Sequence, residues 1–392
     1  MLPRERVEVT LGFEEPDLVP WGEHSIDYTT YEMVLGRESL VQGKMKHTRA
    51  LWEGRRDEIV ESYRRDVPDL VQALGMDIIT IGMQPASGTV HTPLEQVDHE
   101  TYRDRAGNLH RVSKTTHDLR PLRLPTEDYR PPTVEELQRQ IDELEREGVP
   151  RPDDSVWDAA RPVIERYKSE YWINACVGDI GFPWLGRTDE QALLNVALHP
   201  ELHAQAVELQ ARRVIGMVPY YAEQGYDSIM PCGDLGSSTA LLASPAILRE
   251  HVVQWWQRYT DEAKRHGLRV IKHCCGCIWE ALDCIVEGGY EGYEAIQSSG
   301  GMDIRRLKAE YGDKLVLWGG VSNESLILGK PEDIWREAEY AFRWGAPGGG
   351  FIYGASHSLA VGTKYENLMA MKAAREELGH YPTRVAGQGV CG

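Results

Sequence analysis

Two hydrophobic patterns alternate along the chain: amphipathic segments and short apolar runs. From Arg55 to Leu74, apolar residues recur three and four positions apart, which predicts a helix. Met76 to Met83 is mostly apolar and predicts a buried strand. After residue 157 the alternation resumes, with strands predicted at 171–177, 227–232, 269–277, 292–297, 315–319 and 350–354. Helices are predicted at 157–168, 188–196, 199–224, 245–266, 278–288, 304–311, 332–344 and 365–378.

These segments predict an α/β fold. A further strand is expected near residues 18–22, after a short N-terminal helix, which brings the expected total to eight strands, each followed by a helix. Eight strands alternating with helices over 392 residues predict a (β/α)₈ (TIM) barrel. An open doubly wound sheet is the alternative, but no Gly-x-Gly-x-x-Gly motif opens an early helix. We therefore predict the barrel.

Residues 86–150 interrupt this alternation. Thr101–Ser113 resembles a hairpin that turns at residues 106–108, and Pro131–Gly148 has the pattern of a charged amphipathic helix. We expect one domain over residues 1–380 with the insertion at 86–150, followed by a C-terminal tail over 381–392.

Composition narrows the classes of partner. The formal net charge of −18 argues against nucleic acid or an anionic membrane surface as partner. Four of the seven cysteines lie between Cys274 and Cys284, which is a poor disulfide framework and favours metal binding or reactive thiols in a reducing compartment. With neither a long apolar run nor a signal-peptide pattern, we expect a cytoplasmic protein. A homodimer is among the oligomeric states left open.

The strongest candidate chemistry lies in the stretch 269–277, which ends in His273-Cys274-Cys275-Gly276-Cys277. In an extended strand, His273, Cys275 and Cys277 face one side. One imidazole and two thiolates form a ligand set that zinc prefers when a fourth position stays open for substrate. The alternative is a buried strand in which the thiols act as small apolar side chains.

Other polar residues follow the predicted strands, where the active sites of such barrels lie. Asp234, Glu23 and His357 are candidates for catalysis, and Gln297 and Tyr353 for cofactor binding. The two acids are expected to orient other groups or to handle protons. Either acid could equally cap a loop or a helix, and His357 could be a hydrogen-bond partner of the substrate.

Several segments resemble the uroporphyrinogen decarboxylase superfamily. They include the opening residues 3–20, Cys232-Gly233-Asp234-Leu235-Gly236-Ser237, His273-Cys274-Cys275-Gly276, residues 311–320 and residues 346–351. They occur in the family's order, and the resemblance extends from residue 3 to about residue 375. It implies a (β/α)₈ barrel, which agrees with the strand count.

The superfamily holds cofactor-free decarboxylases of uroporphyrinogen and zinc-dependent methyltransferases that act on corrinoids. The decarboxylases carry an arginine-rich stretch after the first strand, as guanidinium groups bind carboxylates. The matching stretch here, residues 20–27, contains no arginine and two acids. The resemblance therefore favours the methyltransferase branch.

The methyltransferases' zinc ligands are the His and Cys of His-x-Cys, matched here by His273 and Cys275, and a cysteine near the eighth strand. Gly349 occupies the position of that cysteine. The third ligand is therefore open among Cys277, Glu23 and His357, of which Cys277 is the simplest by spacing, although Gly276 could turn the chain away.

The expected function is methyl transfer between a small methylated substrate, such as a methoxylated aromatic, a methylamine or a thiol, and the cobalt of a corrinoid. The sequence has no Asp-x-His-x-x-Gly cobalamin motif, so we expect a separate corrinoid protein as partner. The alternative is a cofactor-free decarboxylase of a porphyrinogen or a small carboxylic acid. A non-catalytic binding protein is a further alternative.

Overall fold

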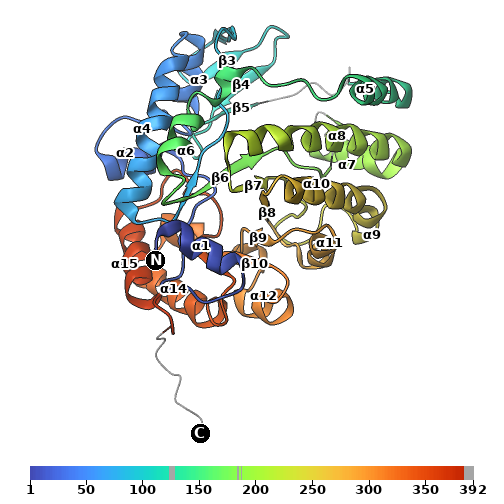
Figure 1. The fold of residues 1–392 in the computed structure, drawn as a ribbon. Helices are drawn as coiled ribbons and strands as arrows, with labels where there is room; N and C mark the ends of the chain where they lie inside the picture. The colour runs from blue at the N-terminus through green and yellow to red at the C-terminus, as the bar shows by residue number, and fades with distance from the viewer. Residues whose placement is uncertain (123–128, 183–184, 187, 384–392) are drawn as a thin grey trace.

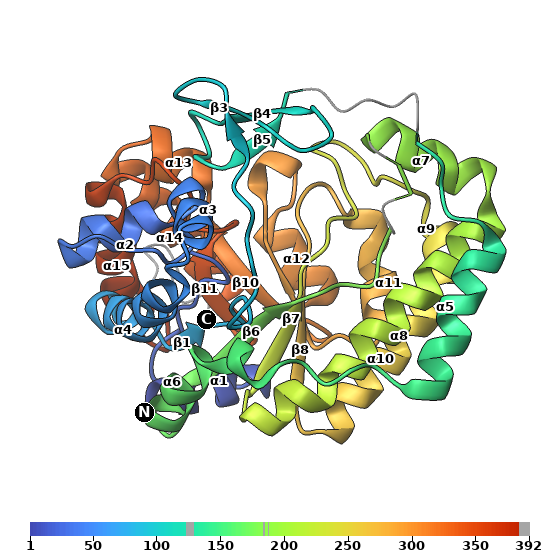
Figure 2. The same ribbon diagram turned by 90° about the horizontal axis from the view of Figure 1, so that it is seen from above.

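A parallel β-sheet with seven strands forms the centre of the molecule, a computed structural model that describes residues 1–122, 129–182, 185–186 and 188–383. The strand order is β1-β6-β7-β8-β9-β10-β11. The strands are β1 (Ile78–Thr80), β6 (Trp172–Val177), β7 (Ser228–Pro231), β8 (Arg269–His273), β9 (Gly292–Glu294), β10 (Val316–Val321) and β11 (Phe351–Ala355). The sheet is curled and surrounded by helices, as Figures 1 and 2 show.

The expected eighth strand near residues 18–22 is reduced to a bridge at Trp21, which corrects the prediction of eight regular strands. Trp21 forms a parallel bridge with Tyr353 of β11. On its other side, the Asp77 N–H donates to the Trp21 carbonyl oxygen at 2.8 Å, just before β1 begins. Pro20 has no N–H and cannot extend the ladder. This short segment therefore links the two edge strands of the sheet.

Alternation along the strands separates two cores. Every second strand residue points to the inside of the curled sheet. These side chains pack against helix α1 (Pro3–Leu11), which covers the end where the strands begin. This inner core contains Val7, Leu11, Ile78, Trp172, Met230, Ile271, Val316, Trp318 and Ile352. The intervening strand residues, such as Ile79 and Val270, pack outward in the larger core beneath the helices. The candidate catalytic and metal-binding residues lie at the opposite end of the sheet, where the strands end.

The outer helices match the predicted alternation, and α12 and α15 have the predicted bounds. They are α2 (Tyr28–Leu35), α3 (Met45–Trp52), α4 (Arg56–Leu74), α6 (Ala160–Tyr167), α7 (Asp189–Leu198), α8 (Pro200–Gln224), α9 (Pro245–Ile247), α10 (Val253–Arg265), α11 (Leu282–Glu287), α12 (Ile304–Tyr311), α13 (Asn323–Leu328), α14 (Pro331–Gly345) and α15 (Tyr365–Leu378). Short turns are η1 (Asp154–Trp157), η2 (Leu248–Val252), η3 (Trp279–Ala281) and η4 (Ser298–Gly300). Across the described ranges, no helix has the length and apolar character needed to cross a membrane.

The insertion contains the predicted hairpin and helix. The hairpin belongs to an antiparallel sheet in the order β2-β3-β4-β5. Its strands are β2 (Glu95–Gln96), β3 (Thr101–Arg103), β4 (Leu109–Val112) and β5 (Leu119–Pro121). Helix α5 (Val134–Glu147) begins at a capping box, in which Thr133 and Glu136 each bind the other's backbone N–H. It packs outside α8, as Figure 2 shows. The expected tail lies outside the described residues from 384 onward.

Candidate metal centre

Strand β8 ends at His273, and the chain then turns sharply through Gly276. Gly276 has φ +86°, and a Cβ there would lie 2.5 Å from the Ser237 carbonyl oxygen. The next residue, Cys277, donates its backbone N–H to the same oxygen at 2.8 Å. The segment 273–277 is therefore not one extended strand, because the backbone turns to meet the loop after β7. The thiol of Cys277 belongs to neither of the groups of potential metal ligands found among the described residues.

His273 and Cys275 instead meet His357, which follows β11. One ligand atom from each of the three lies within 4.8 Å of the others. The Cys275 Sγ and the His273 Nε2 are 3.4 Å apart. Of the three candidates for the third ligand, the structure brings His357 to this group. Burial, with the neighbouring His24 and His273 adding to it, lowers the pKa of His357, so its imidazole is favoured in the neutral form that a metal ligand requires.

A second group, His24, His273 and Glu294, shares His273 with the first. Glu294 is buried in β9, and its two carboxylate oxygens contact two different histidines: Oε1 lies 3.0 Å from His24 Nδ1, and Oε2 contacts His273 Nδ1. Although burial opposes the charged form, His24 and His273 hold the pKa of Glu294 well below its usual range. A buried carboxylate that binds Nδ1 of two imidazoles leaves both Nε2 atoms available for a metal.

The three imidazoles of His24, His273 and His357 surround a common space. Their ring centroids are 4.3 Å apart for His24 and His273, 5.5 Å for His24 and His357, and 5.6 Å for His273 and His357. They come from three distant parts of the chain: the segment after Trp21, strand β8 and the loop after β11. Together with the Cys275 thiol they supply the histidine and cysteine ligands of both potential metal-binding groups in the described part of the chain.

Asp234 and Gln297 hold the backbone of the Cys275 loop. Asp234 Oδ1 accepts the Cys275 N–H at 3.0 Å, and Gln297 Oε1 accepts the Gly276 N–H at 2.8 Å. Burial, supplemented by the charges of Asp234 and Glu294, raises the pKa of the Cys275 thiol. Both predicted residues thus lie at the site, where they position the backbone beside a candidate ligand.

Glu23 is a buried carboxyl at the first strand position. Its Oε1 accepts hydrogen bonds from Trp21 Nε1 at 2.8 Å and from the Ala355 N–H at 3.0 Å. Burial raises its pKa to about 8, with a contribution from the negative charge of Glu294, against these two hydrogen bonds. Glu23 is therefore largely protonated at neutral pH. Its role in handling protons stays a prediction.

Tyr353 lies away from the cluster. It is fully buried in the outer core, stacks near Phe342 with 4.7 Å between ring centroids, and its hydroxyl donates to the Met371 carbonyl oxygen. Its neighbour Ile352 belongs to the inner core, so the alternation of β11 directs Tyr353 toward the helices. This placement gives it packing contacts and none of the contacts expected of a cofactor-binding residue.

The sequence analysis missed His24 and Glu294 as parts of the site. His24 lies within residues 20–27, the stretch that contains no arginine where the decarboxylases are arginine-rich. Glu294 follows Tyr293 in an otherwise apolar strand, and an acid within a buried strand requires charged or hydrogen-bonding partners. That requirement is the signal that identifies it from sequence.

A central cavity of about 470 Å³ opens beside His24. Thr80, Cys176 and Cys232 are among the residues from the adjoining strand ends that line it. Within the described part of the chain, neither an arginine nor a lysine is among its lining residues. The cavity therefore offers polar groups to a small molecule but no cation to a carboxylate.

Comparison with protein families matches residues 186–378 to the uroporphyrinogen decarboxylase (URO-D) family. Residues 186–378 form a URO-D family domain. The matched region contains Asp234, His273, Cys275, Glu294 and His357, whereas Glu23 and His24 precede it. The URO-D match thus covers most of the cluster and leaves the first strand position outside it.

Among solved structures, a methyltransferase from Methanosarcina mazei superposes with a TM-score of 0.66 and 17% identity, over 96% of this chain and 99% of that one. A β-mannanase from the mussel Mytilus edulis reaches a TM-score of 0.43 at 9% identity, with 93% of each chain covered. No curated protein matches this sequence. At such identities the first likeness shows that the URO-D domain and the residues before it share one TIM-like fold with that structure.

Proposed function

We propose that this protein is a zinc-dependent methyltransferase that moves a methyl group between a small methylated substrate and the cobalt of a corrinoid on a partner protein. The observation that carries the proposal is the cluster of His273, Cys275 and His357 at the end of the sheet where the strands end. The fold shared with a protein named as a methyltransferase supports the same conclusion.

The residues fit a zinc ion by their chemistry. Two imidazoles and one thiol are ligands that zinc prefers, and a three-residue set leaves the fourth position for substrate. Glu294 binds Nδ1 of His273, which is the carboxylate–histidine arrangement that orients metal ligands in proteins. The carboxylates of Glu294 and Asp234 add negative charge around Cys275, and a bound cation would compensate it.

Zinc held there would act as a Lewis acid that polarises the group bearing the methyl, or that keeps a thiol acceptor deprotonated. The protein's own residues have separate tasks in this proposal. Asp234 and Gln297 fix the backbone that carries Cys275, and Glu294 orients two imidazoles. Glu23, protonated at neutral pH, can supply a proton to a departing group or retrieve one.

A decarboxylase of polycarboxylates is less compatible with the site. Those described side chains that line the central cavity include no guanidinium or ammonium group that could bind carboxylates. The first strand position likewise provides Glu23 and His24 where arginines would be needed.

Methyl transfer is tested directly with zinc-loaded protein, cob(I)alamin and a panel of donors carrying deuterated methyl groups. Mass spectrometry of the cobalamin detects the label if the proposal is right, and the Cys275→Ser variant gives none. Release of carbon dioxide from a small carboxylic acid, with no label transferred from any donor, would contradict the proposal in favour of a decarboxylase.

A further inference from the structure

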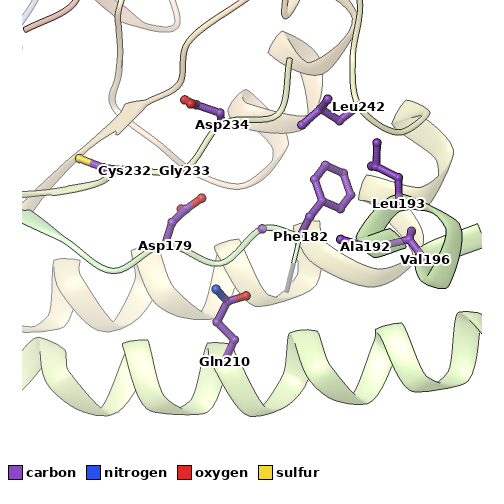
Figure 3. A pocket seen from close by; sticks show the side chains of 11 residues that line it. Asp179, Phe182, Ala192, Leu193, Val196, Gln210, Cys232, Gly233, Asp234 and Leu242 are labelled. Carbon is purple, nitrogen blue, oxygen red and sulfur yellow. The ribbon is translucent and has the colours of Figure 1, made fainter. Parts of the chain in front are cut away.

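A second cavity, of about 370 Å³, lies next to the metal cluster between helices α7 and α8 and the ends of strands β6 and β7 (Figure 3). Its connection to the cluster runs through two lining residues. Asp234 accepts the backbone N–H of Cys275, and Cys232 forms a parallel bridge with His273. A ligand at this end of the cavity therefore lies beside the candidate metal ligands.

The cavity has one apolar end and one polar end, as Figure 3 shows. Phe182, Ala192, Leu193, Val196 and Leu242 form the apolar end. Asp179, Gln210, Cys232 and Asp234 gather at the other. This division suits a molecule with an apolar body and one polar group.

Two buried acceptor atoms at the polar end have no hydrogen-bond partner. They are Asp179 Oδ1 and Gln210 Oε1, and the side chain of Asp179 is more than nine-tenths buried. Buried acceptors are nearly always satisfied in folded proteins, so this pair indicates a missing donor. A ligand with N–H groups would supply it.

The charges around the cavity disfavour an anion. Among the residues that the structure describes, neither an arginine, a lysine nor a histidine lines it. The nearest ammonium, that of Lys272, is already occupied by Asp179 Oδ2 at 2.9 Å and by the carbonyl oxygens of Gly233 and His273 at 2.8 and 2.9 Å. The described residues thus place two carboxyl groups, those of Asp179 and Asp234, at the polar end beside the single ammonium of Lys272. Phe182 adds an aromatic ring at the apolar end, against which an apolar body can pack.

We propose that this cavity binds the methylated substrate and that the substrate is a protonated N-methylamine with an apolar body. The inference rests on the proposed function and names its substrate class. The ammonium group donates to Asp179 and Gln210 at the polar end, beside the cluster, while the body packs against Phe182, Leu193 and Leu242. In the transfer, the C–N bond breaks with its electron pair left on nitrogen. Because the nitrogen already carries a proton and has no free electron pair for zinc, the proton itself makes it a leaving group. It departs as a neutral amine, and the methyl carbon bonds to the cobalt(I) of the partner corrinoid, whose two electrons form the new bond.

Calorimetry with N-methylbenzylamine, whose protonated form has two N–H groups, and with benzyl methyl ether and benzoate tests this assignment. The first is a cation at neutral pH, the second a neutral molecule of similar shape and the third an anion. We expect the amine to bind at least tenfold more tightly than the ether, and benzoate not to bind. Equal binding of amine and ether, or tighter binding of benzoate, would overturn the assignment.

Two substitutions locate the bound amine. Leu242→Trp fills the apolar end from a position that is 39% exposed, and we expect it to abolish binding with no change in thermal unfolding. Leu194→Trp is the matched control, since Leu194 lies on α7, is 51% exposed and does not line the cavity. Gln210→Leu should lower the affinity for the amine several-fold and lower the affinity for the ether less. Unchanged binding of the amine in Leu242→Trp would overturn the proposal.

The same protein stripped of metal by a chelator separates this inference from the proposed function. If the amine still binds without metal while the zinc-loaded protein transfers no methyl group from any donor, the cavity assignment is supported and the methyltransferase is contradicted. Methyl transfer from other donors that Leu242→Trp leaves intact would support the methyltransferase and contradict the cavity assignment.

Discussion

At the scale of single residues, Glu294 determines how two histidines present their rings. It is almost completely buried and its two oxygens bind Nδ1 of His24 and of His273. A glutamine in its place could accept from only one of the two rings and would add an N–H₂ group where an acceptor is needed. The position of Glu294 on β9 therefore affects metal binding without a direct bond to the metal.

We expect Glu294→Gln to lower zinc affinity about 10- to 100-fold, the usual effect of losing a carboxylate behind a histidine ligand. Competition with a colorimetric chelator measures the change. Glu291→Gln is the control, because Glu291 lies three residues earlier and pairs with Arg269 at the surface. Equal affinity in Glu294→Gln and the parent protein would show that Glu294 does not orient the ligands.

His203 on α8 provides a second test at this scale, one of stability against pH. Its ring is fully buried, neither nitrogen has a hydrogen-bond partner, and burial, with nearby His251, lowers its pKa to about 4. The unfolded chain binds this proton near pH 6.5, before the folded protein does. The contribution of neutral His203 is therefore complete above that pH and is lost as the pH falls toward 4.

His203→Phe should flatten the rise of unfolding free energy between pH 4 and 6.5, by up to about 1.4 kcal/mol per pH unit for one proton. Urea unfolding at several pH values measures the slope. His99→Phe, at a position where the side chain is 86% exposed, should leave it unchanged. A slope equal to that of the parent protein in His203→Phe would contradict this account.

At the scale of elements, strand β8 serves two purposes through its alternation. Ile271 and His273 face the inside of the sheet, whereas Val270 and Lys272 face outward. Lys272 is fully buried and pairs with Asp179 at 2.9 Å, so it ties β8 to the chain that follows β6. The strand thus anchors the metal cluster and, through Lys272, contacts Asp179, which lines the second cavity.

We expect Lys272→Met to lower the free energy of unfolding by about 3–5 kcal/mol, because Asp179 is left buried without its partner. Urea unfolding near neutral pH measures the loss, and the double variant with Asp179→Leu should recover part of it. Arg306→Met, which removes an exposed pair with Glu310, should cost less than about 1 kcal/mol. A cost below about 1 kcal/mol for Lys272→Met would show that the pair does not hold the two strands together.

Hydrophobic periodicity predicted most elements, because barrel strands and their helices bury one face each. Helices α12 and α15 have the predicted bounds, and the insertion contains the predicted hairpin and α5. Helix α13 was missed because its six residues leave too few turns for a periodic pattern, and α3 was missed as well. The predicted helix 245–266 is divided by the π turn η2, a local irregularity without a periodic signal.

The site was predicted in part, since its contacts combine distant segments. His273 and Cys275 are two residues apart and were found from spacing, and His357 was named among the alternatives. His24 and Glu294 join them only because the sheet curls and brings the first strand position beside β9 and β11. Whether Cys277 faced the same side depended on Gly276, whose positive φ turns the chain.

At the scale of the whole molecule, the curled sheet brings the two ends of the chain together. Arg375 on α15 donates to the Val19 carbonyl oxygen at 2.8 Å and contacts Asp77, which also accepts from Arg6 of α1 at 3.1 Å. The segment around Trp21 is thereby fixed to both edge strands. Glu23 and His24, which follow it, therefore lie at the end of the sheet where the strands end. Fold and site therefore depend on the same closure.

The most direct test is the zinc content of the untagged protein, measured by plasma mass spectrometry beside Cys275→Ser and Cys277→Ser. We predict about one zinc per chain in the parent protein and in Cys277→Ser, and its loss in Cys275→Ser. Full zinc in Cys275→Ser, or none in the parent protein after incubation with zinc, would contradict a metal centre built on His273, Cys275 and His357.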